Sequence, residues 1–314
     1  MRINRLPRAV SILARKVIGA EGLDVPPVPH DRVVSRADWY GEIALSPDET
    51  DAICADLASR GVHVVTRDLN AGDFWDFVRS HEVCFPPFDK SALPADLAEI
   101  ADALRLEKLI EFYLSFSLAE LQPGDAVADV GSASSPFLDM VVGMHNGTGH
   151  AIDPSLAVET QIRNGITNHP RLISEASAGL PSLRAMTLHC SFEMFAPNEM
   201  ISVITTAADK LQAGGKLIIS PLYLRRERTI YVDATRMPVS AYVAASRVKT
   251  AVVGVADYWG LNWSEWLSPA DVEERLALQR RDLSFSIIRL RGVEKVDPRC
   301  FIRFAGIWTK RENQ

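Results

Sequence analysis

A strand-like run that ends in an acid and then turns through small residues is the part of this sequence best suited to hold a ligand. The run AVADVGSASSPF places Asp129 at the end of a predicted strand, with Gly131 just after it. Small side chains let a ligand approach the backbone, and the N-terminus of the next helix offers unpaired N–H groups. The turn consists of Gly131, Ser132, Ala133, Ser134 and Ser135. We expect Asp129 and this turn to form a ligand site.

A second acid, Asp153, ends the next predicted strand, GHAID. An acid at this position can accept hydrogen bonds from both hydroxyls of a ribose. Taken singly, Asp129 is also explained as a helix or turn cap and Asp153 as a surface turn beside Pro154. Because the two acids end successive predicted strands, we predict a site for a ribose-containing cofactor.

The segment LHCSFEMF follows a later predicted strand and carries three polar side chains, His189, Ser191 and Glu193. In open α/β sheets, ligands bind beyond the carboxyl ends of the strands, so these residues are candidates to meet a substrate. Histidine side chains in general titrate close to physiological pH, so His189 is a candidate general base, and Glu193 can orient it or replace it in that role. The alternatives are a hydrogen-bonded core histidine and an acid on a helix surface.

Aromatic and basic residues follow the fifth predicted strand and form a candidate substrate region. Stacking on sugar rings or other flat molecules is one use for such rings, and a hydrophobic cluster beneath a long loop is the other. The residues concerned are Tyr223, Arg225, Tyr258, Trp259, Trp263 and Trp266.

The elements that must position these residues predict an α/β fold. Short apolar runs at 126–132, 149–153, 171–176, 185–191 and 216–224 alternate with helix-sized connections, which indicates a doubly wound, mostly parallel sheet. The runs 284–294 and 299–310 are joined by a short turn and should form a C-terminal antiparallel hairpin. A broad apolar helix is expected between Pro94 and Leu121, ahead of the first strand.

Three regions are expected along the chain. Residues 1–30 form a basic amphipathic end and a linker, residues 31–93 a small accessory α/β region, and residues 94–314 the main domain with a substrate-side insertion at about 223–268. The first twenty residues suit peripheral membrane contact or docking on their own domain.

Composition narrows the classes of protein. A net charge of −6 and a pI near 5.7 give no field to attract a polyanion, so we expect no nucleic-acid partner. Four scattered cysteines suggest neither a zinc site nor a disulfide framework, which fits the cytoplasm. No apolar run reaches the length of a transmembrane segment, and no Asp, Glu and His cluster at ligand spacing requires a metal.

The chain from about Glu107 to Lys310 resembles a class I S-adenosylmethionine-dependent methyltransferase, particularly the branch that modifies polysaccharides and glycans. The resemblance rests on DVGSASSPF, LHCSFEMF and LQAGGKLIISPLYL. It implies that the Gly131 turn contacts the methionine part of the cofactor, that Asp153 holds the ribose, and that Glu175 lies near the adenine amine. Only the first glycine of the usual GxGxG turn remains, so a positive φ at Ala133 or Ser135 would strain the turn.

The sequence therefore predicts methyl transfer from S-adenosyl-L-methionine to a hydroxyl of a sugar or glycan intermediate, in which His189 is the candidate base. A nicotinamide-dependent sugar oxidoreductase or epimerase is the alternative enzyme, although the sequence lacks GxGxxG after the strand. A binding module of the same fold that has lost catalysis is the third hypothesis, because the turn has lost glycines. The oligomeric state is not predicted.

Overall fold

The computed structural model describes most of the region from Ala44 onward. The described residues are 44–92, 95–133, 135–156, 162–163, 165–232, 252–254, 263–277 and 280–312. The basic amphipathic end at 1–30, Ser134, Tyr258 and Trp259 lie outside these ranges.

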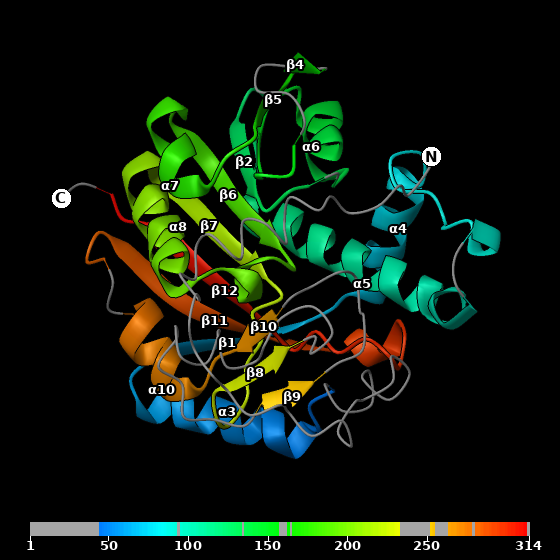
Figure 1. Cartoon of the computed structure of the whole chain (residues 1–314), viewed down its shortest axis with the longest axis vertical. Helices are drawn as coiled ribbons and strands as arrows, with labels where there is room; N and C mark the ends of the chain where they lie inside the picture. The colour runs from blue at the N-terminus through cyan, green and yellow to red at the C-terminus, as the bar shows by residue number, and fades with distance from the viewer. Residues whose placement is uncertain are drawn as a thin grey trace, which may run out of the picture.

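A nine-stranded sheet, in the order β1-β11-β12-β7-β6-β2-β3-β5-β4, forms the centre of the molecule (Figure 1). Neighbouring strands are parallel except where β12 lies between β11 and β7 and where β4 pairs with β5. The strands are β1 (His63–Asp68), β2 (Ala126–Val130), β3 (Thr148–Ile152), β4 (Ile162–Arg163), β5 (Ile166–His169), β6 (Leu183–His189), β7 (Leu211–Ser220), β11 (Leu283–Arg291) and β12 (Phe304–Lys310). The mostly parallel sheet and its C-terminal antiparallel hairpin, β11 and β12, confirm the predicted fold class.

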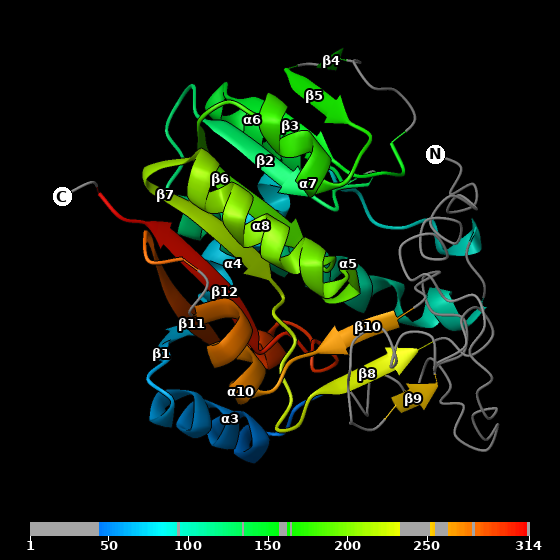
Figure 2. The same ribbon diagram turned by 60° about the vertical axis from the view of Figure 1, so that its left-hand side comes forward.

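Helices cover both faces of this sheet, which explains why its central strands are apolar on both sides. Figure 2 shows α8 (Pro197–Lys210) in front of the strands, and α4 (Ala71–His81) and α5 (Ala95–Ala119) behind them. Leu217 and Ile219 of β7 pack in the hydrophobic cluster that contains α8, whereas Ile218 packs with α5 and α6 (Phe137–His145). Alternate residues of one strand thus bury in opposite layers.

One predicted strand is wrong. Residues 171–176 were expected to be extended, but Ile173–Ala176 forms the short helix α7, and the strand β5 lies just before it. Ile173 and Ala176 are both buried at helical spacing, and α7 packs on α8. A short apolar run is compatible with the periodicity of either a strand or a helix, and packing on a neighbouring helix favours the helix here.

The strand within the expected accessory region 31–93 joins the main sheet. Helix α3 (Pro47–Ser59) begins with a capping box, in which Ser46 and Glu49 satisfy each other's backbone N–H groups, and it leads into β1. β1 then pairs in parallel with β11 over its whole length. This segment therefore extends the edge of the sheet and does not form a sheet of its own.

The expected insertion contains a second, three-stranded sheet. Its strands are β8 (Thr229–Val232), β9 (Val252–Gly254) and β10 (Trp263–Trp266), in the order β10-β8-β9. The remaining elements are α10 (Pro269–Asp271), the π-helical η5 (Val272–Ala277), and the 3-10 turns η2 (Lys90–Ala92), η3 (Ser177–Gly179), η4 (Phe192–Met194) and η6 (Val293–Lys295). None of the helices in the described part of the chain is both long and apolar enough to cross a bilayer.

Candidate functional site

The strand order reverses between β2 and β6, and the site residues lie in the loops that follow these two strands. From β2 the chain continues to β3 and β5 on one side, and it then returns to β6 on the other side. Ligands of open α/β sheets bind at such a switch point, beyond the carboxyl ends of the strands. Gly131 follows β2 and Glu193 follows β6, so the structure brings the two predicted segments together.

Position 131 requires a glycine for two reasons, the conformation of its backbone and the close approach of Ser191. Its φ of 71° favours glycine, and a Cβ built here would lie 2.5 Å from the Cβ of Ser191. Its N–H donates to the carbonyl of Ile152 at 2.8 Å, which fixes the turn against β3. Ser191 in turn donates to the carbonyl of Val130 at 3.0 Å. Ser191, predicted to contact substrate, therefore joins the loop after β6 to the end of β2.

Asp153 lies against the small-residue turn, and its predicted contact with the ribose stays a prediction. Its Oδ2 accepts from the N–H of Ala133 at 3.0 Å and its Oδ1 from that of Ser155 at 2.7 Å. Ala133 has a φ of 41°, so the strain expected where the glycine is missing is present. The hydrogen bond to Asp153 holds Ala133 in this conformation.

The rest of the turn leads into helix α6. Ser132 is buried, and its hydroxyl has no hydrogen-bond partner among the described residues. The N–H of Ser135 donates to the carbonyl of Ser132 at 2.7 Å, and the hydroxyl of Ser135 accepts from the N–H of Phe137 at 3.2 Å. Ser135 thus satisfies the backbone N–H of Phe137, the first residue of α6, whose N-cap residue is Pro136.

Asp129 lies in β2, just before the turn, and its side chain is buried. Its Oδ1 accepts from the hydroxyl of Thr187 at 2.8 Å and lies 2.9 Å from Nδ1 of His189. Nε2 of His189 lies 2.8 Å from the hydroxyl of Ser115 on α5. Asp129, His189 and Ser115 therefore form a buried chain of hydrogen bonds that joins β2, β6 and α5.

His189 has little freedom to act on a substrate. Both ring nitrogens have partners, the side chain is 3% exposed, and the ring packs between Phe112 and Phe137. A base must bring a free nitrogen within reach of the proton it takes. The geometry therefore favours a positioning role for His189 over the predicted role as general base.

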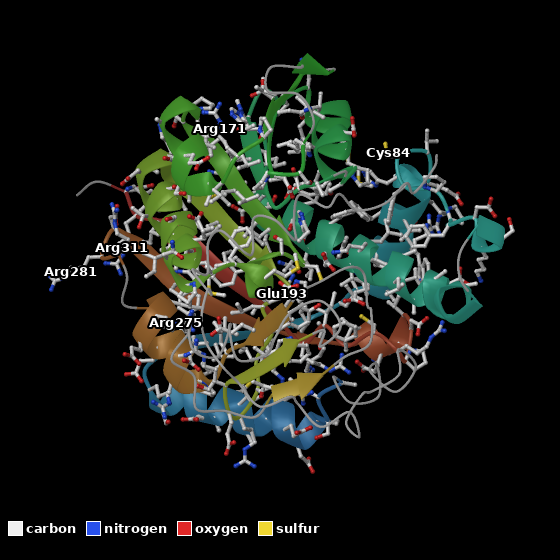
Figure 3. All side chains as sticks on the ribbon, in the orientation of Figure 1. Cys84, Arg171, Glu193, Arg275, Arg281 and Arg311 are labelled. Atoms are coloured by element: carbon white, nitrogen blue, oxygen red, sulfur yellow. The ribbon has the colours of Figure 1, made fainter. Side chains whose placement is uncertain are left out.

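Glu193 meets the requirement for a general base better than His189 does. It lies in η4, near the centre of the molecule in Figure 3, and it is 4% exposed. Its Oε2 has no hydrogen-bond partner among the described residues. Burial raises the pKa of Glu193 to about 7, which places the carboxylate in the range of a physiological base.

Three residues of α5 that the sequence analysis missed lie beside this segment. Glu107 and Glu111 are buried, and burial raises the pKa of both. Lys108 donates to Oε2 of Glu111 at 2.9 Å and to the carbonyl of His189 at 3.4 Å. The available signal was the spacing of Glu107 and Glu111, which lie one helical turn apart with Lys108 between them in a leucine- and phenylalanine-rich helix.

The aromatic residues divide into those that pack together and those outside the described part. Tyr223 and Trp266 are buried and stack with ring centroids 4.5 Å apart, and the guanidinium of Arg225 lies over the Trp266 ring. Trp266 also donates to the hydroxyl of Ser264 at 2.8 Å. This packing favours the hydrophobic cluster over a free stacking surface. Trp263 lies in β10.

The sequence also predicted a residue near the adenine of the cofactor and no required metal site. Glu175 lies on α7 with an exposed side chain, and its contact with adenine stays a prediction. Among the described residues, no three His, Cys, Asp or Glu side chains are grouped so that they could hold a metal ion.

Gly131→Ala is expected to lower the free energy of unfolding by about 1–3 kcal/mol, because the new Cβ meets Ser191 and the backbone has a positive φ. Gly143→Ala is the control: its Cβ would meet no atom of the described residues within 4 Å, and the residue lies inside helix α6. That variant should be more stable than the wild type by about 0.5–1 kcal/mol. Urea denaturation measures both, and equal stability of the two variants would contradict the close contact.

The chain matches no protein-family model and no curated protein. Among solved structures, it is similar to Burkholderia thailandensis 1,6-didemethyltoxoflavin-N1-methyltransferase, with 10% identity over 86% of this chain and 92% of that one and a TM-score of 0.42. Human N-acetylserotonin methyltransferase is 11% identical over 87% of this chain and 74% of that one, with a TM-score of 0.35. Geobacter metallireducens precorrin-6y C5,15-methyltransferase is 15% identical over 34% of this chain and 60% of that one, with a TM-score of 0.28. The chain therefore spans about three fifths of the length of that protein. The chemistry of the site has to be argued from this chain's own residues.

Proposed function

We propose that this chain transfers a methyl group from S-adenosyl-L-methionine to a hydroxyl of a sugar or glycan intermediate. The observation that carries the proposal is the turn after β2 at the switch point of the sheet, with Asp153 bound to the N–H of Ala133. The antiparallel β12 between β7 and β11 supports it, because a parallel sheet that ends in such a hairpin is typical of Rossmann-like methyltransferases.

The cofactor fits the residues at the end of β2 and β3. Asp153 is half-buried, and each of its carboxylate oxygens has a further lone pair beyond the bond it already accepts. It holds the two ribose hydroxyls, while Gly131 lets the methionine part approach the backbone. The hydroxyl of buried Ser132, which no described residue binds, is a further contact. Glu175 is proposed to hold the adenine amine.

The acceptor side requires a group that takes a proton. S-adenosyl-L-methionine supplies a methyl group that its sulfonium already makes electrophilic, so the protein has to align the acceptor oxygen and receive its proton. We assign the proton to Glu193, whose Oε2 has no hydrogen-bond partner in the described part of the chain. Asp129 and His189 hold the end of β6 in place, and Lys108 binds the His189 carbonyl from α5.

Two other functions are separated from this one by the ligand that binds. A nicotinamide-dependent oxidoreductase or epimerase should bind NAD, and a binding module that has lost the cofactor should bind neither ligand. Calorimetry with S-adenosylhomocysteine and with NAD distinguishes the three. Binding of S-adenosylhomocysteine alone is the result we expect, and binding of NAD alone would overturn the proposal.

Asp153→Ala is expected to weaken S-adenosylmethionine binding by more than tenfold, about 1.4 kcal/mol, because the ribose loses both acceptors. The control is Asp76→Ala, which removes an exposed acid from α4 that contacts Arg79. Its affinity should equal that of the wild type. Calorimetry measures the affinity and thermal unfolding confirms that the variants are folded. An unchanged isotherm for Asp153→Ala would remove this residue from the site.

A further inference from the structure

Buried acids of α5 and η4 lie together next to the loop that follows β6. Glu111 is fully buried and Glu107 and Glu193 are each 4% exposed. The charges of Glu111 and Glu193 both raise the pKa of Glu107, and that of Glu111 also raises the pKa of Glu193, so the three carboxylates lie close enough to interact. Lys108 joins this group to the site, because its Nζ donates both to Glu111 and to the carbonyl of His189. We refer to Glu107, Lys108, Glu111 and Glu193 as the acidic group.

The acidic group has more negative than positive charge. It contains three carboxylates and one ammonium, and that ammonium binds only one of the two oxygens of Glu111. Oε1 of Glu111 and Oε2 of Glu193 are buried without a hydrogen-bond partner among the described residues. An unpaired buried carboxylate costs several kcal/mol, so such groups bind a cation, hold a proton or wait for a ligand.

We infer that the methyl acceptor carries a protonated amine, bound by Oε1 of Glu111 beside Glu193. An ammonium supplies the donors that these oxygens lack, and it offsets one of the excess negative charges. A neutral sugar would leave the charge excess unchanged, and a phosphorylated or carboxylated one would increase it. Together with the proposed transfer to a hydroxyl, on which this inference rests, the acceptor is an amino sugar or a related amino alcohol.

The competing explanation is that the acids simply hold protons. Burial raises the pKa of Glu107 and Glu111, so protonation is an available state when no ligand is bound. A bound ammonium favours the charged carboxylates and displaces those protons. The two explanations differ in one respect: only an amine-binding site predicts that an amine binds more tightly than its neutral counterpart.

The test uses matched pairs of ligands that differ only in an amine. Binding of glucosamine and glucose, galactosamine and galactose, and ethanolamine and ethylene glycol is measured by calorimetry at about pH 7, with the full chain and saturating S-adenosylhomocysteine. We expect at least one amine to bind tenfold or more tightly than its neutral partner. Glu111→Gln should remove this preference, while Glu294→Gln, which changes an exposed acid of η6, should keep it.

The outcomes separate this inference from the proposed function. If S-adenosylhomocysteine binds but no amine is preferred, the inference fails and the proposed methyl transfer stands. If S-adenosylhomocysteine does not bind, the proposed function fails, and the same titrations without it still decide whether the acidic group selects amines. If the preference survives Glu111→Gln, Glu111 is not the residue that recognises the amine. Glu107→Gln provides a second variant should Glu111→Gln fail to fold.

Discussion

Glu193→Gln is expected to slow methyl transfer by about 10²–10⁴-fold, the usual contribution of a general base. Glutamine keeps the size of the side chain but cannot take a proton. Because burial raises the pKa of Glu193 to about 7 in the chain without acceptor, the wild-type rate at subsaturating acceptor, which reports the free enzyme, should rise with pH up to about 7 and then level off. This rise should be missing in Glu193→Gln. Single-turnover rates with labelled cofactor, measured against pH, give both results.

Glu199→Gln is the matched control for this experiment. Glu199 is also a buried glutamate, but it lies on α8 and accepts from the hydroxyl of Ser174 at 2.8 Å. Its replacement should leave the rate and its pH dependence unchanged, and both variants should bind S-adenosylhomocysteine like the wild type. A full rate with the same pH profile in Glu193→Gln would show that another group takes the proton.

The same substitution has a second, independent readout in stability. The folded chain keeps the proton of Glu193 up to about pH 7, whereas the unfolded chain releases it near the ordinary value of 4.5. The contribution of Glu193 to stability is therefore present below about pH 4.5 and is lost as pH rises through 7, by about 3 kcal/mol in all. Glu193→Gln should remove this part of the pH dependence and be more stable than the wild type at about pH 8.

The sequence predicted the scaffold of the site well because strands and turns have local signals. The runs around Asp129, Asp153 and His189 are strands β2, β3 and β6, and parallel pairing brings their carboxyl ends to one edge. The contact between Asp153 and the turn follows from this order. Of the two positions where a positive φ would strain the turn, Ala133 has one and Ser135 does not.

The direction in which side chains point was not predictable in the same way. His189 ends a strand beside the candidate site, yet Asp129 and Ser115 occupy both of its ring nitrogens. These partners are 60 or more positions away in the chain, so no local pattern specifies them. Glu107 and Glu111 were overlooked for a related reason: charged residues on a helix usually face water, and only packing against the sheet buries them.

Asp129→Ala is expected to lower the free energy of unfolding by about 2–5 kcal/mol, because each buried donor that loses its acceptor costs about 1–3 kcal/mol. The side chains of Asp129 and His189 are 1% and 3% exposed, and their atoms Oδ1 and Nδ1 lie 2.9 Å apart. The substitution also removes the acceptor of the Thr187 hydroxyl. Asp102→Ala is the control, since it breaks an exposed pair with Lys90 and should cost about 1 kcal/mol or less.

A double variant tests whether Asp129 acts through His189. With His189→Ala alone, the carboxylate of Asp129 keeps the hydroxyl of Thr187 but loses its second partner. Residues of one hydrogen-bonded network are coupled by about 0.5–3 kcal/mol, so the combined variant should lose less stability than the two single losses together. Guanidinium denaturation of the three variants measures this coupling. Strictly additive losses would mean that the two residues stabilise the chain separately, and the role of His189 in holding the end of β6 through Asp129 would have to be abandoned.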